Sequence, residues 1–174
     1  MRSGDRIRWT LSRLERDLMQ DLMRSLAALL DEADRSDPAT ARLFPRAVTD
    51  DEQADAELRG LIHEDLAGVK QAGVMAIADL LERGTRKGRE LRVELDEDEA
   101  LLVLGVLNDV RLAIGARVGI ERIDRGEVDP EGEDGYRLAV MDHLGMWQEL
   151  LLAELDPPPV RRDAGLDPDD LLDL

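Results

Sequence analysis

The sequence predicts a mainly α-helical fold, with about four to five helices packed around one core and a minor two-stranded β-sheet. The chain of 174 residues is long enough for one domain with a sizeable core. Aromatic residues make up only 2% of it, so the core must be largely aliphatic, which suits helices packed on helices. A strand–cap–helix pattern also occurs twice, and this repetition predicts the sheet.

The first strand–cap–helix unit begins with "IRWTLSRLERDLM", where apolar residues alternate with polar ones from Ile7 to Leu11. Such alternation is typical of a strand with one buried face. Ser12 then precedes Glu15 by three residues, which is the spacing of a helix capping box. We therefore expect a strand and a cap, followed by a helix over 13–34.

The second unit, "LRVELDEDEALL", has the same order. Apolar residues alternate from Leu91 to Leu95, and Asp96 precedes Glu99 at capping-box spacing. Acidic residues in a first turn are also favoured by the helix dipole. We expect a strand that pairs with the first one, because neither is stable alone, and then a long helix over 97–120.

The acidic residues of this second unit do not predict a metal site. A calcium loop that started at Asp96 would need glycine at its sixth position and glutamate at its twelfth, but these positions are Leu101 and Leu107. His63 and His143 are isolated and form no ligand set, so each is expected to lie on a surface or helix face. No metal and no cofactor is predicted.

Two further helical regions are expected, with a connection before the first of them. The segment "ARLFPRAVTDDEQ" reads as a loop or short turn. A helical region then starts at Thr49 or Asp50 and ends at the glycines of "ERGTRKGRE", with a bend near Gly60 or Gly68. The last helix starts at residue 133 or 135 and ends at residue 155.

Several side chains at helical spacing are expected in the core. Leu14 belongs to the apolar stripe of the first helix, and Val69 belongs to that of the second helical region. Trp9, Tyr136 and Trp147 are predicted to be core anchors rather than stacking platforms.

These elements make up one predicted domain, residues 1–155. From 156 to 174 the chain is rich in proline and acidic residues, and we expect a flexible tail. Its end, "LDPDDLLDL", is either a short docking motif that folds on a partner or an unstructured tail.

Charge argues against direct nucleic-acid binding. The chain has 23 basic and 40 acidic residues, a net charge of −17, and a phosphate backbone repels such a protein. Residues 1–46 are nearly neutral, with nine arginines and eight acids, so that alternative is confined to this segment. There is no signal-peptide-like or membrane-spanning apolar run, and the cytoplasm is the expected location.

The segment "LNDVRLAIGARVGI", residues 107–120, contains the strongest candidate site. It is expected to be a buried helix, yet it carries four polar residues: Asn108, Asp109, Arg111 and Arg117. At 100° per residue, Asn108 and Arg111 share one stripe with two glycines, which would let another helix approach closely.

Two interpretations of Arg111 remain open, since an unpaired buried charge is costly. In one, Arg111 lies in a binding groove and anchors an anion or carboxylate. In the other, it forms an internal ion pair, with Glu64 or Asp65, that fixes the register of the helices. No phosphate-cradling loop or nucleophile elbow is present, so no catalytic residue is predicted and the protein is expected not to be an enzyme.

Four segments, in this order and spacing, resemble the AosR-type family, an actinobacterial family long known only as a domain of unknown function. They are "RLFP", "ELRGLIHEDL", "LNDVRLAIGARVGI" and "MDHLGMWQELL", and the resemblance covers residues 7–155. The resemblance implies a small cytoplasmic protein linked to transcriptional control of oxidative-stress responses through contacts with the transcription machinery. Redox-active cysteines are invoked for some members, and this chain has no cysteine.

On this basis we expect a non-enzymatic regulatory protein that acts through protein contacts in the control of stress or cysteine-metabolism genes. Its expected partner is RNA polymerase or a sigma factor, and a homodimer is left open. Genes of the family commonly lie beside those for a protease adaptor and for cysteine synthesis with a sulfur-carrier protein. The alternative is therefore an adaptor or accessory factor for proteolysis or for that synthesis.

Overall fold

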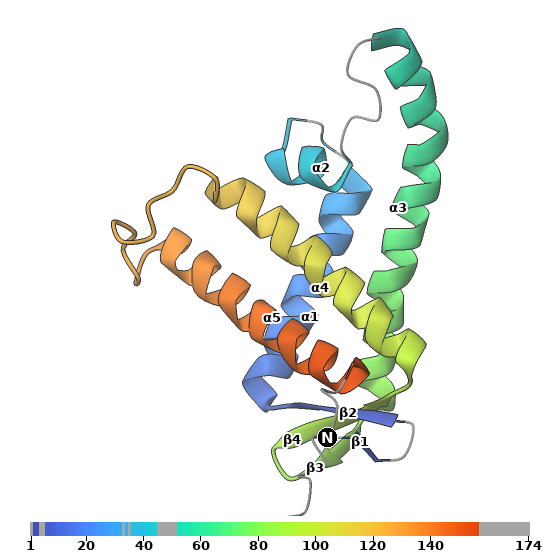
Figure 1. Cartoon of the computed structure of the whole chain (residues 1–174), viewed down its shortest axis with the longest axis vertical. Helices are drawn as coiled ribbons and strands as arrows, with labels where there is room; N and C mark the ends of the chain where they lie inside the picture. The colour runs from blue at the N-terminus through green and yellow to red at the C-terminus, as the bar shows by residue number, and fades with distance from the viewer. Residues whose placement is uncertain (1, 4–5, 33, 35, 45–51, 157–174) are drawn as a thin grey trace, which may run out of the picture.

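A computed structural model describes residues 2–3, 6–32, 34, 36–44 and 52–156. Within these residues the chain forms five helices and a small sheet (Figure 1), so the prediction of a mainly helical fold is confirmed. The elements, in chain order, are β1 (Arg2–Ser3), β2 (Arg6–Leu11), α1 (Arg13–Glu32), α2 (Pro38–Leu43), α3 (Glu52–Arg83), β3 (Thr85–Lys87), β4 (Glu90–Leu95), α4 (Glu97–Val118) and α5 (Glu133–Leu155).

The sheet is built around the two strands that the sequence predicts. β2 and β4 pair antiparallel, with Trp9 opposite Val93. Alternate side chains of both strands are buried, and the polar residues between them are exposed or half-buried. The strand pairing predicted from two distant segments is therefore confirmed.

The predicted number of strands is too small. β1 and β3 flank the central pair, and the full order is β1-β2-β4-β3. β3 lies in the segment "ERGTRKGRE", which is predicted only to end a helix. All three of its side chains are exposed, so no alternation of apolar residues marks it. Gly88, at φ +64°, makes the turn between β3 and β4 in a conformation that favours glycine.

The expected loop after α1 contains the short helix α2. Asp37 caps this helix by accepting a hydrogen bond from the backbone N–H of Ala39 at 2.8 Å, and Pro38 occupies the first turn. Leu43 is buried at the other end of the helix. Six residues are too few to display a helical period, which is why the sequence pattern misses α2.

The other helix limits agree closely with expectation. α1 ends at Glu32, two residues early, and α4 ends at Val118, where Gly119 closes the helix at φ +70°. The predicted start of α3 at residue 49 or 50 lies outside the described residues. α3 is one continuous helix through both glycines at which a bend is expected (Figure 1).

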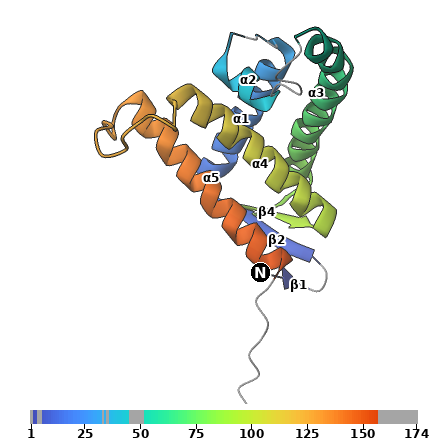
Figure 2. The same ribbon diagram turned by 45° about the horizontal axis from the view of Figure 1, so that its top comes forward.

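The helices form one layered body above the sheet. α4 lies between α5 and α3 in both views, and the sheet closes one end of the bundle (Figures 1 and 2). No described helix has the length and apolar character needed to cross a membrane. Side chains from the helices and the sheet share one core, whose most buried large members are Leu11, Met19, Ile77, Val93, Leu95, Val103, Leu107 and Leu144.

Three residues predicted in the core are exposed instead. Leu14 is 79% exposed, Val69 is 69% exposed and Tyr136 is 63% exposed. Leu14 and Tyr136 lie in the first turns of α1 and α5, where few neighbouring elements cover a helix. Trp9 and Trp147 are buried, as predicted.

Both predicted capping boxes are present. The Ser12 hydroxyl accepts from the N–H of Glu15 at 3.2 Å, and the Glu15 carboxylate accepts from the N–H of Ser12 at 2.7 Å. The same two bonds join Asp96 and Glu99, each at 2.9 Å. Each box satisfies backbone donors at the point where a strand of the sheet gives way to a helix.

Glu99 also has a second role, because its carboxylate forms ion pairs with two arginines from other elements. Arg83, at the end of α3, lies 2.7 Å from its carboxylate, and Arg6 of β2 lies 3.6 Å from it. The hydrogen bond from Arg83 outweighs the effect of burial and holds the pKa of Glu99 below its usual value. The cap therefore ties α4 to both α3 and the sheet.

Replacing Glu99 by glutamine is expected to lower the free energy of unfolding by about 1 kcal/mol at neutral pH. Glutamine still suits the capping-box position but loses both ion pairs. A lowered carboxylate pKa stabilises the fold above the unfolded value of about 4.3, and this stabilisation disappears as the pH falls through the folded pKa. Urea unfolding of the wild type and the variant at pH 7 and near pH 3 measures this. The difference between their free energies of unfolding should become smaller in acid, and an equal difference at both pH values would contradict the ion pairs of Glu99.

Candidate functional site

The four polar residues predicted on α4 do not form one common site: Asn108 and Arg111 line the same cavity, whereas Asp109 and Arg117 pair with other elements. Asp109 faces α3, where its carboxylate lies 2.6 Å from Nζ of Lys70. Each of the two side chains is only 14% exposed. This ion pair joins α4 to α3 and makes Asp109 a structural residue.

Arg117 faces α2. Its Nη2 lies 2.7 Å from the carboxylate of Asp37, the residue that caps α2. The hydrogen bond from Arg117 is the main reason why the pKa of Asp37 lies below its usual value. Arg117 therefore fixes the short helix α2 to the end of α4.

Arg111 faces α5. Its Nη1 donates a hydrogen bond to Oε1 of Gln148 at 2.5 Å, and Nε2 of Gln148 donates to the backbone carbonyl of Leu104 at 3.3 Å. The guanidinium lies against Gly145, where a Cβ would sit 3.5 Å from its Cζ. Gln148 thus orients Arg111 between the two helices.

Arg111 has no carboxylate partner among the described residues. Neither expected partner is seen: Asp65 is exposed on α3, and the side chain of Glu64 lies outside the described part. Within that part, every other half-buried arginine lies within 3.0 Å of a carboxylate: Arg8, Arg16, Arg92 and Arg137. The link between α4 and α3 that Arg111 was expected to make is made by Asp109 and Lys70 instead.

A cavity of about 660 Å³ lies beside Arg111, at the junction of α2, α4, α5 and the segment after α4. The stripe of α4 that carries Asn108, Arg111 and the two glycines lines it. We call it the Arg111 cavity; its described lining is Pro38, Ala41, Arg42, Asn108, Arg111, Leu112, Gly115, Ala116, Gly119, Ile120, Glu121, Arg122 and Met141.

A second feature lies on α5, near the sheet. Met146 is 45% exposed and Leu150, one turn further on, is 59% exposed. Both line a shallow groove of about 280 Å³ between α5 and β2, which also reaches Trp9 and Trp147. We call Met146, Leu150 and this groove the Met146–Leu150 surface.

One comparison with known proteins bears on identity. A family model described as a domain of unknown function, DUF2017, matches residues 1–155. The chain belongs to the DUF2017 family. The match ends where α5 ends, and it contains both the Arg111 cavity and the Met146–Leu150 surface. No curated protein and no solved structure matches the chain.

His143 of this DUF2017 chain lies on α5 and faces α1. Its Nε2 lies 3.2 Å from the Glu15 carboxylate, and its ring centroid lies 4.5 Å from that of Trp147. Burial acts to raise the pKa of Glu15, but hydrogen bonds from Ser12 and the neighbouring His143 hold it below its usual value. His143 therefore joins α5 to the first capping box. The side chain of His63 lies outside the described residues.

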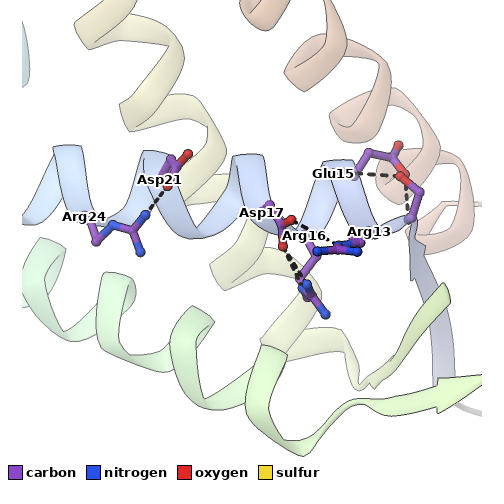
Figure 3. A network of polar contacts seen from close by, with 7 residues as sticks. Arg13, Glu15, Arg16, Asp17, Asp21 and Arg24 are labelled. Atoms are coloured by element: carbon purple, nitrogen blue, oxygen red, sulfur yellow. Dashed lines mark hydrogen bonds and ion pairs between the residues drawn. The ribbon is translucent and has the colours of Figure 1, made fainter. Parts of the chain in front are cut away.

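The N-terminal arginines of the DUF2017 fold are partly neutralised by neighbouring acids (Figure 3). Arg16 and Arg13 lie 2.6 Å and 3.8 Å from the carboxylate of Asp17, and Arg24 pairs with Asp21. Arg16 is the main cause of a lowered pKa at Asp17. Across a depression of about 600 Å³, the β3–β4 hairpin adds two further arginines, Arg86 and Arg89.

Replacing Arg111 by alanine is expected to lower the free energy of unfolding by about 1–2 kcal/mol, because Gln148 loses a charged donor and the arginine stem loses its packing. Thermal unfolding of the variant measures this. Arg125, which is exposed and pairs with Asp142 at 3.1 Å, provides the control. Alanine at Arg125 should change the free energy by less than about 1 kcal/mol. Equal effects at both positions would show that Arg111 contributes nothing beyond an exposed arginine.

Proposed function

We propose that this DUF2017 protein is a non-enzymatic regulator that acts by binding other proteins through the Met146–Leu150 surface. The observation that carries the proposal is the exposure of two large apolar side chains, one turn apart, beside an apolar groove. Gathered apolar side chains at a surface are typical of sites that bind a partner.

The proposed partner is RNA polymerase or a sigma factor, and the proposed role is transcriptional control of stress or cysteine-metabolism genes in the cytoplasm. The resemblance to the AosR-type family supports this role, and membership of DUF2017 is compatible with it. The net charge of −17 favours partners with basic surfaces, since complementary charge speeds association. Because the chain has no cysteine, the proposal includes no thiol switch.

Affinity purification of the tagged full chain tests the proposal. The test variant is Met146→Glu/Leu150→Glu. Its matched control is Met75→Glu/Leu14→Glu, which changes a methionine and a leucine that are exposed on other helices by the same charge. We expect the wild type and the control to recover RNA polymerase or a sigma factor and the test variant to lose it. Recovery of protease or cysteine-synthesis proteins instead would favour an adaptor.

We also expect no measurable binding to duplex DNA at physiological salt. The depression lined by Arg13, Arg16, Arg86 and Arg89 lies on a protein whose net charge is −17. A duplex that reached it would also meet the surrounding acidic surface, so phosphate contacts would be opposed by repulsion. A gel-shift titration checks this. Micromolar, sequence-selective binding that Arg86→Gln/Arg89→Gln abolishes would overturn the protein-contact proposal.

A further inference from the structure

The Arg111 cavity is lined by arginines that form no ion pair with any described residue. Arg42 of α2 and Arg122, just after α4, line it together with Arg111. No described carboxylate lies within ion-pair distance of these three, although the chain has 40 acids for 23 bases. Glu121 is the one acid in the described lining. Three arginines and one acid therefore line one concave space, which gives the described lining a net positive charge.

Arg111 is held in one orientation by its neighbours. Gln148 holds Nη1, the guanidinium rests on Gly145, and Nε is buried without a hydrogen-bond partner among the described residues. An arginine that is half-buried and oriented, but has no counter-ion, has unused donors that favour an anion. Arg42 and Arg122 are exposed at the rim, where they can close on the same anion.

Much of the remaining lining is apolar. Leu112 of α4, Ile120 and Met141 of α5 contribute large apolar side chains to its lining. A Cβ at Gly115 would sit 3.3 Å from Met141 Cε, so the glycine lets Met141 pack closely against α4 at the cavity wall. The cavity volume of about 660 Å³ is typical of small-molecule sites. Such sites combine a largely apolar lining with a few polar groups.

From these observations we infer that the Arg111 cavity binds a small organic acid, with a carboxylate or phosphate group paired to the arginines and an apolar body against Leu112, Ile120 and Met141. This site is separate from the Met146–Leu150 surface and does not depend on the proposed function. A ligand here would touch α2, α4 and α5 together, so the bound state would link three helices that meet at this end of the fold.

Titration calorimetry of the full chain with octanoate, octyl phosphate and octanol tests the inference. We expect saturable binding of one or both acids, and binding of the uncharged octanol that is at least about tenfold weaker. The tighter acid identifies the head group. Octanol binding as tightly as the acids would overturn the inference, as would failure of both acids to saturate at millimolar concentration.

Variants test the role of the arginines without disturbing the core. Arg42→Gln/Arg122→Gln changes two exposed side chains and should weaken acid binding about tenfold or more, whereas Arg24→Gln/Arg125→Gln, with the same change of charge, should not. Glu121→Gln removes the opposing acid and should strengthen binding. Unchanged affinity in Arg42→Gln/Arg122→Gln, or weaker binding in Glu121→Gln, would contradict the inference.

Discussion

Replacing Trp147 by alanine is expected to lower the free energy of unfolding by about 3–5 kcal/mol, as is usual for a buried tryptophan. The side chain is 3% exposed and meets Trp9 edge to face, with ring centroids 5.7 Å apart. It also packs against the ring of His143. Loss of this side chain would therefore leave a cavity where α5 meets the sheet, and a domain of marginal stability would be largely unfolded near 37 °C.

The neighbouring residue provides the control for this prediction. Met146 precedes Trp147 on α5 but is 45% exposed, so Met146→Ala should cost less than about 1 kcal/mol. Urea unfolding of both variants measures the contrast. Similar losses would mean that Met146 is a core residue, and the Met146–Leu150 surface would then not be available to a partner.

Replacing Asp109 by leucine is expected to cost about 2–3 kcal/mol. The variant leaves Lys70, which is 14% exposed, without the carboxylate that lies 2.6 Å away. Removing one member of a buried pair is destabilising chiefly because the other charge stays behind without compensation. This loss of stability is smaller than that expected for a fully buried ion pair, because both groups retain some contact with water.

A double-mutant cycle separates this effect from a simple loss of packing. Lys70→Met/Asp109→Leu removes both charges and should recover most of the stability lost in Asp109→Leu, since an apolar pair of similar volume fits the same interface. Thermal unfolding of the two single variants and the double variant gives the coupling energy. Additive losses would show that the two side chains do not interact in solution.

The parts of the fold that the sequence predicts well are those with a local signal. β2, β4 and both capping boxes follow from alternation and from a three-residue spacing, which act over a few neighbouring positions. β3 is not predicted because its side chains are all exposed. α2 is not predicted because six residues are too few to show a full helical pattern. The exposure of Leu14 and Tyr136 depends on where neighbouring helices end, and no local pattern reports that.

For the candidate site, too, local features are predicted from the sequence and contacts between distant residues are not. The stripe with Asn108 and Arg111 is predicted from helical spacing, and it does line one cavity. The partners of Arg111 and Asp109 are not predicted, because Gln148 and Lys70 lie 37 and 39 residues away. The Met146–Leu150 surface had a signal that could have been used: α5 carries more large apolar residues than its buried face needs, so some must be exposed.

Hydrogen exchange on the recovered complex tests the central claim, that α5 presents the surface by which this protein binds its partner. The account predicts slower exchange in peptides that cover Met146 and Leu150 when the partner is bound, with α3 unchanged around Met75. Protection confined to α3 or to the β3–β4 hairpin, with α5 exchanging as in the free protein, would contradict it.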